Sequence, residues 1–209
     1  MKENLKELFN QWQKELDGKF VPDGTINFEQ WEKTNKKILV ILKETNDFDN
    51  FGLNDLINKN ITNSKSGIWK GLTWHNIGRV SYGLLNTSAP FKDAHKKRKE
   101  TLKHIAVMNI KKTAGKSKSK YKTIKFHAEK YKDYIKKEIE IINPDIVILG
   151  GTYDFLKNIL NLEKISDNLY KEKGNDKRIY IKCYHPGYFR ISTKEYYENC
   201  VKPYLKFIK

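Results

Sequence analysis

Short apolar runs that end in polar residues or glycine are the feature of this sequence that most limits its fold. Three of them, Ile38–Leu42, Ile105–Met108 and Ile146–Leu149, are continuous, as in strands buried on both faces. A fourth, Arg178–Cys183, alternates and stops at Tyr184-His185-Pro186-Gly187. Because these runs alternate with helical patterns, the sequence predicts an α/β fold. We expect a three-layer α/β/α sandwich around a central, mostly parallel four-stranded sheet.

The spacing of apolar residues between these runs predicts the helices. Residues 126–142 have helical periodicity that ends at Asn143-Pro144, and Thr152 can cap another helix. Ser192 and Glu195 have the spacing of a capping box before a last amphipathic helix. No linker separates a second domain. We therefore expect residues 1–209 to form a single domain, with an N-terminal helix (residues 1–18) packed on it.

The composition excludes several classes of protein. Two cysteines, Cys183 and Cys200, are too few for a disulfide framework or a four-thiolate cluster. No stretch approaches the roughly 20 apolar residues that a membrane span needs. The charged N-terminus lacks the apolar segment of a signal peptide. We therefore expect a cytoplasmic protein with reduced thiols and no membrane partner.

Positive charge is concentrated in the middle of the chain. The formal net charge is +16, and the segment Lys92–Lys125 alone has 13 Lys/Arg against 2 Asp/Glu, a net +11. Such a block is typical of a surface that binds a polyanion, and nucleic acid is the predicted partner. The alternative is a solvated, lysine-rich surface, which the many Asn, Ile and Lys residues of the chain also fit.

Asn109 and His185 are the first candidate functional residues, because each follows a predicted strand. Open α/β sheets bind their ligands at the carboxyl ends of their strands. The carboxamide of Asn109 can form two hydrogen bonds with the edge of a nucleobase, or can merely cap the strand. The imidazole of His185 can donate to an oxygen that gains negative charge as a bond breaks, or can serve only the turn. The other histidines lack metal-ligand spacing.

The end of the first strand offers further candidates. Glu44, Asn46 and Asp47 crowd it, and a carboxylate there can orient water or stabilise a cationic sugar-like transition state. A polar loop with helix capping is the alternative. The Gly150-Gly151-Thr152 turn after the third strand permits a close backbone approach, or serves packing alone.

Together these residues resemble the uracil-DNA glycosylase superfamily, in the right order and over roughly residues 36 to 205. The segment 38–47 occupies the place of its first motif, and 105–109 looks like the second strand, whose terminal Asn reads the extruded base. The segment 144–152 looks like the third strand and its turn. His185–Arg190 looks like the His-Pro-Ser motif, in which the His contacts the base oxygen and the next residues push into the duplex.

The first motif departs from the family pattern, because it lacks both the Gly and the Pro. A gapless match places Glu44 on the Glu of the Gly-Glu-Ala-Pro-Gly branch. A shift of about one residue places Asn46 on the catalytic Asn or Asp of other branches. The branch with the Glu carries an iron–sulfur cluster, which two cysteines cannot hold. The altered motif also leaves the base open: uracil, a damaged base or a bulkier modified base.

The resemblance implies a monofunctional DNA glycosylase that needs no metal or cofactor and acts on double- or single-stranded DNA as a monomer. A non-catalytic protein that binds DNA or a nucleotide is the rival hypothesis, and an RNA-directed enzyme is a third. The catalytic residues would come from Glu44, Asn46, Asp47 and His185. Base binding would fall to Asn109, Phe48 and Phe51. The residues expected to contact DNA are Lys111, Lys112, Lys116, Lys118, Lys120, Gly187, Tyr188, Phe189 and Arg190.

Overall fold

The structure is a computed structural model that describes residues 1–46, 52–63, 65–87, 89–116 and 118–209. Within these residues the strands form one seven-stranded mixed sheet in the order β1-β3-β2-β4-β7-β6-β5. An α/β fold is therefore confirmed, whereas the predicted four-stranded sheet is wrong in its number of strands. The strands are β1 (Gly24–Thr25), β2 (Ile38–Leu42), β3 (Ala106–Asn109), β4 (Ile146–Gly150), β5 (Leu162–Ser166), β6 (Leu169–Glu172) and β7 (Asn175–Cys183).

The centre of the sheet is parallel and its edges are antiparallel. Strand β2 pairs in parallel with β3 and β4, and β4 pairs in parallel with β7. Strand β1 adds to one edge, and the β5–β6 hairpin extends the other, in antiparallel pairing. These added strands escape sequence prediction because β1 is only two residues long and β5 is largely polar, with a partly exposed pattern. The four predicted runs make the parallel centre.

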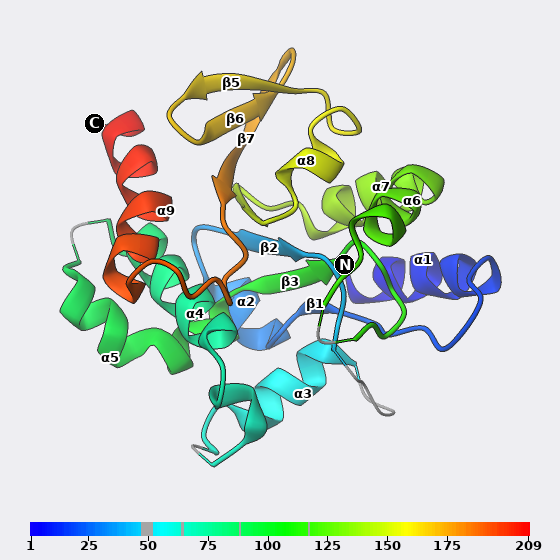
Figure 1. Ribbon diagram of the computed structural model, residues 1–209, viewed down its shortest axis with the longest axis horizontal. Coiled ribbons are helices and arrows are strands. Elements are labelled where there is room, and N and C mark those ends of the chain that lie inside the picture. Colours follow the sequence, from blue (N-terminus) through cyan, green and yellow to red (C-terminus); the bar gives the residue numbers. More distant parts are fainter. Residues whose placement is uncertain (47–51, 64, 88, 117) are drawn as a thin grey trace.

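Helices cover both faces of the sheet. Alternate residues of β2 point in opposite directions, so Val40 joins one apolar cluster and Leu39 the other. Figure 1 shows α4, α5 and α9 on one side of the sheet and α1, α6 and α7 on the other. The helices are α1 (Lys2–Lys14), α2 (Phe28–Lys33), α3 (Leu53–Asn60), α4 (Leu72–Leu85), α5 (Phe91–Thr101), α6 (Tyr121–Lys130), α7 (Lys132–Ile142), α8 (Tyr153–Leu156) and α9 (Thr193–Phe207), with short 3-10 turns η1 (Gly67–Trp69) and η2 (Leu102–His104).

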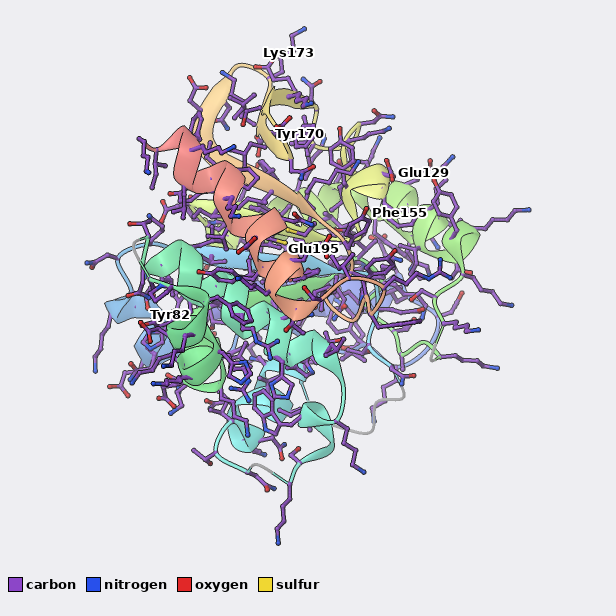
Figure 2. The ribbon with its side chains drawn as sticks, turned by 60° about the vertical axis from the view of Figure 1, so that its left-hand side comes forward. Tyr82, Glu129, Phe155, Tyr170, Lys173 and Glu195 are labelled. Atoms are coloured by element: carbon purple, nitrogen blue, oxygen red, sulfur yellow. The ribbon has the colours of Figure 1, made fainter. Side chains whose placement is uncertain are left out.

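The ends of the helices test the sequence signals for capping. Ser192 begins α9 as predicted, since its side-chain oxygen accepts from the backbone N–H of Glu195 at 3.1 Å. Figure 2 shows this helix, with Glu195 labelled, lying over the sheet beside α4. The helix predicted over residues 126–142 is divided at Tyr131 into α6 and α7. Within the described part of the chain, no helix is long and apolar enough to cross a membrane.

Candidate functional site

A cleft of about 770 Å³ lies where the parallel strands end. Its walls come from the segments after β2 and β3, from the turn after β7 and from the region of η1 and α4. The structure thus brings together side chains that are far apart in the sequence. The predicted site residues that line the cleft are Glu44, Asn46, Asn109, Lys116, Lys118 and His185.

Asn109, at the end of β3, lies in the cleft with an unsatisfied side chain. Only 2% of the residue is exposed, and its Oδ1 has no hydrogen-bond partner among the residues that the structure describes. Leaving such an acceptor buried and unpaired costs about 1–3 kcal/mol. A ligand that donates a hydrogen bond here would remove this cost, so the site suits a molecule with an N–H group.

A buried ion cluster holds the backbone of Asn109. The N–H of Asn109 donates to Asp23 Oδ2 at 2.7 Å. Lys112 Nζ lies 2.5 Å from the other Asp23 oxygen and 2.8 Å from Glu138. Burial raises the pKa of Glu138, against the opposing charge of Lys112. The cluster therefore fixes the end of β3 and leaves the side chain of Asn109 free for the cleft.

Lys112, which the sequence predicts to contact DNA, belongs to this buried cluster. The side chain of Lys112 is 0% exposed, so it cannot reach a phosphate. Charge patterning alone could not detect this, because the partner carboxylates lie 89 and 26 residues away in the chain.

His185 lies in the cleft as a neutral imidazole. Burial, and then the nearby charge of Lys43, lower its pKa to about 4. Its Nδ1 accepts from the backbone N–H of Gly187 at 3.1 Å. A neutral imidazole that accepts at Nδ1 carries its proton at Nε2. His185 is therefore a hydrogen-bond donor at physiological pH without being a cation.

The backbone of the His185 turn is held from two sides. The carbonyl oxygen of Pro186 accepts from Asn76 Nδ2 of α4 at 2.7 Å. On the other side Gly151, at φ +72°, approaches so closely that a Cβ there would lie 3.1 Å from the backbone nitrogen of His185. Thr152 Oγ1 donates to the carbonyl of Ile41 at 3.0 Å and makes no capping hydrogen bond to α8. The Gly150-Gly151-Thr152 turn thus has a packing role.

Glu44 is paired with Lys111, for which the sequence predicts a contact with DNA. Lys111 Nζ lies 2.8 Å from Glu44 Oε2 and also donates to the carbonyls of Thr113 and Ala114. The two side chains are 10% and 6% exposed. Lys111 therefore satisfies its charge inside the protein, and its predicted phosphate contact is not supported. Its place is beside the candidate catalytic carboxylate.

The remaining lysines of the segment after β3 are exposed. Lys116 and Lys118 line the cleft, and Lys120 precedes α6. Asn46 forms an isolated parallel bridge with Gly115, which joins this segment to the end of β2. Asp47, Phe48 and Phe51 lie outside the described residues.

The turn after β7 continues into exposed side chains. Phe189 is 78% exposed, and Arg190 beside it is also exposed. The rings of Tyr184 and Tyr188 stack at 4.7 Å between centroids. Gly187 contributes its backbone N–H to His185. This segment thus presents aromatic and cationic groups directly after His185, the residue of this turn that lines the cleft.

Sequence reasoning missed part of the cleft wall. Ile68 of η1, with Thr73 and Trp74 of α4, lines the cleft, although none of them follows a strand. It also missed Asp23 and Asn76, which position Asn109 and the His185 turn. Their partners lie 86 and 110 residues away in the chain, and no local pattern signals such contacts.

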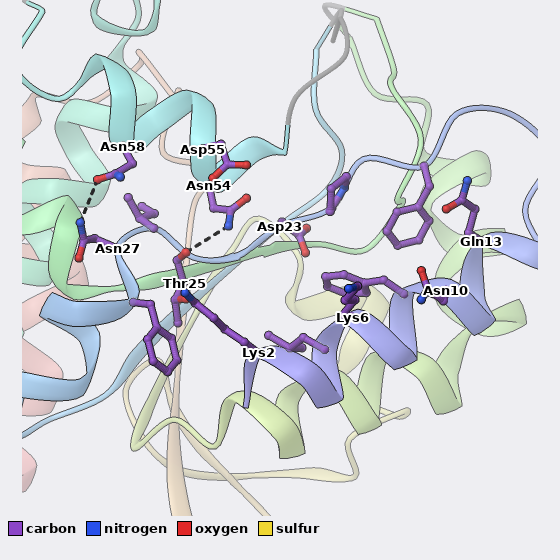
Figure 3. A pocket seen from close by; sticks show the side chains of 16 residues that line it. Lys2, Lys6, Asn10, Gln13, Asp23, Thr25, Asn27, Asn54, Asp55 and Asn58 are labelled. Atoms are coloured by element: carbon purple, nitrogen blue, oxygen red, sulfur yellow. Dashed lines mark hydrogen bonds between the residues drawn. The ribbon is translucent and has the colours of Figure 1, made fainter.

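A second cavity, of about 500 Å³, lies between α1 and the region of α2 and α3 (Figure 3). Figure 3 shows asparagine side chains on its upper wall and Lys2 and Lys6 on α1. Asp23 lines this cavity while its carboxylate bonds Lys112 and Asn109. None of the predicted site residues that the structure describes lines it, so the cleft at the strand ends is the stronger candidate.

Within the described residues, no group of three or more His, Cys, Asp or Glu side chains is placed to hold a metal ion. The chain matches no protein-family model, and no curated protein matches it in sequence.

Proposed function

We propose that this chain is a monofunctional DNA glycosylase that takes a damaged or modified base out of DNA and hydrolyses its N-glycosidic bond. One observation carries the proposal: the cleft holds an acceptor that bonds none of the described residues, Asn109 Oδ1, and a neutral donor, His185 Nε2–H. The edge of a nucleobase offers an N–H next to a carbonyl oxygen. Enzymes that act on a base flip it into such a pocket and read its edge by hydrogen bonds.

His185 would act on the departing base. As the bond from C1′ to the base nitrogen breaks, its electron pair moves onto the base, and negative charge grows on the base oxygen. A hydrogen bond from Nε2–H stabilises that charge, and one such donor contributes about 10²–10³ in rate. Because the pKa of His185 is lowered to about 4, the donor keeps its proton and stays neutral above that pH.

Glu44 or Asn46 would position the water that attacks C1′. The oxygen of the water bonds to C1′, and a proton leaves to a carboxylate or to solvent, which completes the hydrolysis. Glu44 already accepts from Lys111, but a carboxylate has lone pairs for further hydrogen bonds. Glu44, Asn46 and Asp47 all remain candidates for the residue that positions water.

The surroundings of the cleft suit DNA. Lys116 and Lys118 add positive charge to its wall, which favours phosphate binding and a strong dependence of affinity on salt. Phe189 and Arg190 are exposed and follow the cleft residue His185 closely in the chain, so they are available to fill the gap that a flipped nucleotide leaves.

The proposal is tested by incubating the protein with DNA duplexes and single strands that carry different modified bases, followed by alkaline cleavage at abasic sites. Asn109→Ala and His185→Ala should each lower the rate of base release by about 10²–10³. Matched controls are Asn10→Ala and His104→Ala, which lie outside the cleft. Release of base by His185→Ala at the unmodified rate, on a verified substrate, would show the mechanism to be wrong.

A non-catalytic DNA-binding protein is the second candidate function, and the state of Glu44 favours it. The side chain of Glu44 is 6% exposed and paired with Lys111. A carboxylate that could position water is therefore already engaged in an ion pair. The two candidates differ in one result. A binder retains DNA with a modified base in a gel-shift assay and leaves no abasic site, whereas a glycosylase leaves both a free base and an abasic site.

A further inference from the structure

Helices α4 and α5 cross in direct backbone contact. A Cβ on Gly78 of α4 would lie 1.9 Å from the carbonyl oxygen of Arg98 on α5, so only glycine fits there. This approach brings His95 and Arg98 of α5 against His75 and Arg79 of α4. We call these four residues the α4–α5 crossing cluster.

Each guanidinium of the cluster donates to an imidazole. Arg98 Nε donates to His75 Nδ1 at 2.9 Å, and Arg79 Nε donates to His95 Nδ1 at 3.3 Å. Both histidines therefore carry their proton on Nε2. His75 uses that proton on the carbonyl of Trp69 at 3.2 Å. His95 is exposed, and its Nε2–H has no partner in the described part of the chain.

No carboxylate of the described residues pairs with the two guanidinium groups of the cluster. Burial, and then the charge of Arg98, lower the pKa of Arg79 to about 10. Burial, and then the charges of Arg98 and Arg79, lower the pKa of His75 to about 4. Among the described residues, neither guanidinium forms an ion pair with a carboxylate within 4.0 Å. Partly buried charges normally have a counter-charge, so a bound anion would stabilise these two guanidinium groups.

We propose that the α4–α5 crossing cluster binds a phosphate group, which Arg98 and the Nε2–H of His95 contact while Arg79 holds His95 in place. Arg98 donates from Nε to His75 and from Nη1 to the carbonyl oxygen of His95. Its Nη2, which bonds none of the described residues, is the donor available to a phosphate oxygen, an acceptor that a guanidinium suits. The imidazole of His95 adds a neutral donor, Nε2–H. The adjacent Arg79 is a donor to this ring and cannot accept the proton. This site goes beyond the proposed function, because it holds whether or not the protein releases a base.

The cluster is connected to the cleft by hydrogen bonds. Arg79 Nη1 donates to Asn76 Oδ1 at 2.8 Å, and Asn76 donates in turn to the carbonyl of Pro186, next to His185. The phosphate can therefore come from the backbone of a nucleic acid strand that enters the cleft, or from a small phosphate compound. Lys96 and Lys97, exposed on α5, would add attraction without a fixed geometry.

The test compares Arg98→Gln with Lys97→Gln in the whole chain. The control removes the same charge from an exposed neighbour on the same helix. Binding is followed by the NMR signals of the Arg79 Nε–H group and of the His95 imidazole, which every variant retains, during titration with inorganic phosphate, with pyrophosphate, and with a DNA duplex in which single phosphates are replaced by uncharged methylphosphonates. Arg98→Lys keeps the charge but loses the fork, and thermal melting shows that each variant folds.

We expect saturable binding in the unmodified chain and in Lys97→Gln, its loss in Arg98→Gln, and partial loss in Arg98→Lys. If inorganic phosphate or pyrophosphate saturates the site and DNA does not, the ligand of the site is a small phosphate compound. Saturation by DNA, abolished by one methylphosphonate position and accompanied by a salt slope lower by about 1 in Arg98→Gln, identifies the nucleic acid backbone. Saturation by none of the three probes, or equal losses in Arg98→Gln and Lys97→Gln, would overturn the proposal. Base release is assayed separately, so a failure of the glycosylase proposal leaves this result unchanged.

Discussion

Two lysines four residues apart should respond in opposite ways to the same substitution. Lys112 is 0% exposed, and its ammonium bonds two carboxylates and lies 5.2 Å from the centroids of the Phe9 and Trp12 rings. Lys116 is exposed at the cleft. Methionine preserves most of the apolar length of either side chain. The pair Lys112→Met and Lys116→Met therefore separates buried charge from surface charge.

We expect Lys112→Met to lower the free energy of unfolding by about 3–5 kcal/mol, because it leaves Asp23 and Glu138 without their cation. Lys116→Met should change it by no more than about 0.5 kcal/mol. Lys116→Met should instead lower the salt slope of DNA binding by about 1, an effect that a folded Lys112→Met protein should not show.

Urea denaturation followed by tryptophan fluorescence measures the stability, and fluorescence anisotropy of labelled DNA at several salt concentrations measures the slope. A loss below about 1 kcal/mol in Lys112→Met, or equal losses in the two variants, would refute the buried ion cluster.

Three further substitutions test the structure away from this cluster. The pKa of His185 lies below that of an unfolded histidine, so the native state binds fewer protons between about pH 4 and 6.5 and its stability falls as the pH is lowered through that window. His185→Gln should reduce this acid-induced loss by at most about 3 kcal/mol, measured by urea denaturation at pH 7 and pH 4; an unchanged pH dependence would contradict the neutral imidazole. Gly78→Ala should cost at least about 1–3 kcal/mol, because the new Cβ meets the Arg98 carbonyl; an unchanged melting temperature would argue against the close crossing. Ser192→Ala should cost about 1 kcal/mol in thermal melting through loss of the α9 cap, and no loss would show that the cap is not formed.

The parallel centre of the sheet could be predicted because its strands are buried on both faces. Ile38–Leu42 is apolar at every position, and each of its residues is 5% exposed or less. A run of this kind has few alternatives once it lies between amphipathic helices. The edge strands could not be predicted, since β5 and β6 are partly exposed and their pairing depends on a turn at Asn168, which has a positive φ of 59°.

In the candidate site, the positions of the residues could be predicted from the sequence, but the states of their side chains could not. The positions of Asn109 and His185 at strand ends follow from local pattern, and the structure places both in one cleft. The state of each side chain does not follow from local pattern. That Asn109 has an unsatisfied oxygen, or that His185 is neutral with its proton on Nε2, depends on Asp23, Gly187 and the burial around them.

The lysines of the basic block show what the sequence determines and what the tertiary structure determines. The sequence by itself determined that the chain is strongly basic and that Lys111, Lys112 and Lys116 follow a buried strand. Only the tertiary structure decided that Lys111 pairs with Glu44 and Lys112 with Asp23 and Glu138, while Lys116 remains exposed. The physical reason is that the environment of a charge depends on burial and on partners from distant segments, which close only when the sheet and its helices pack.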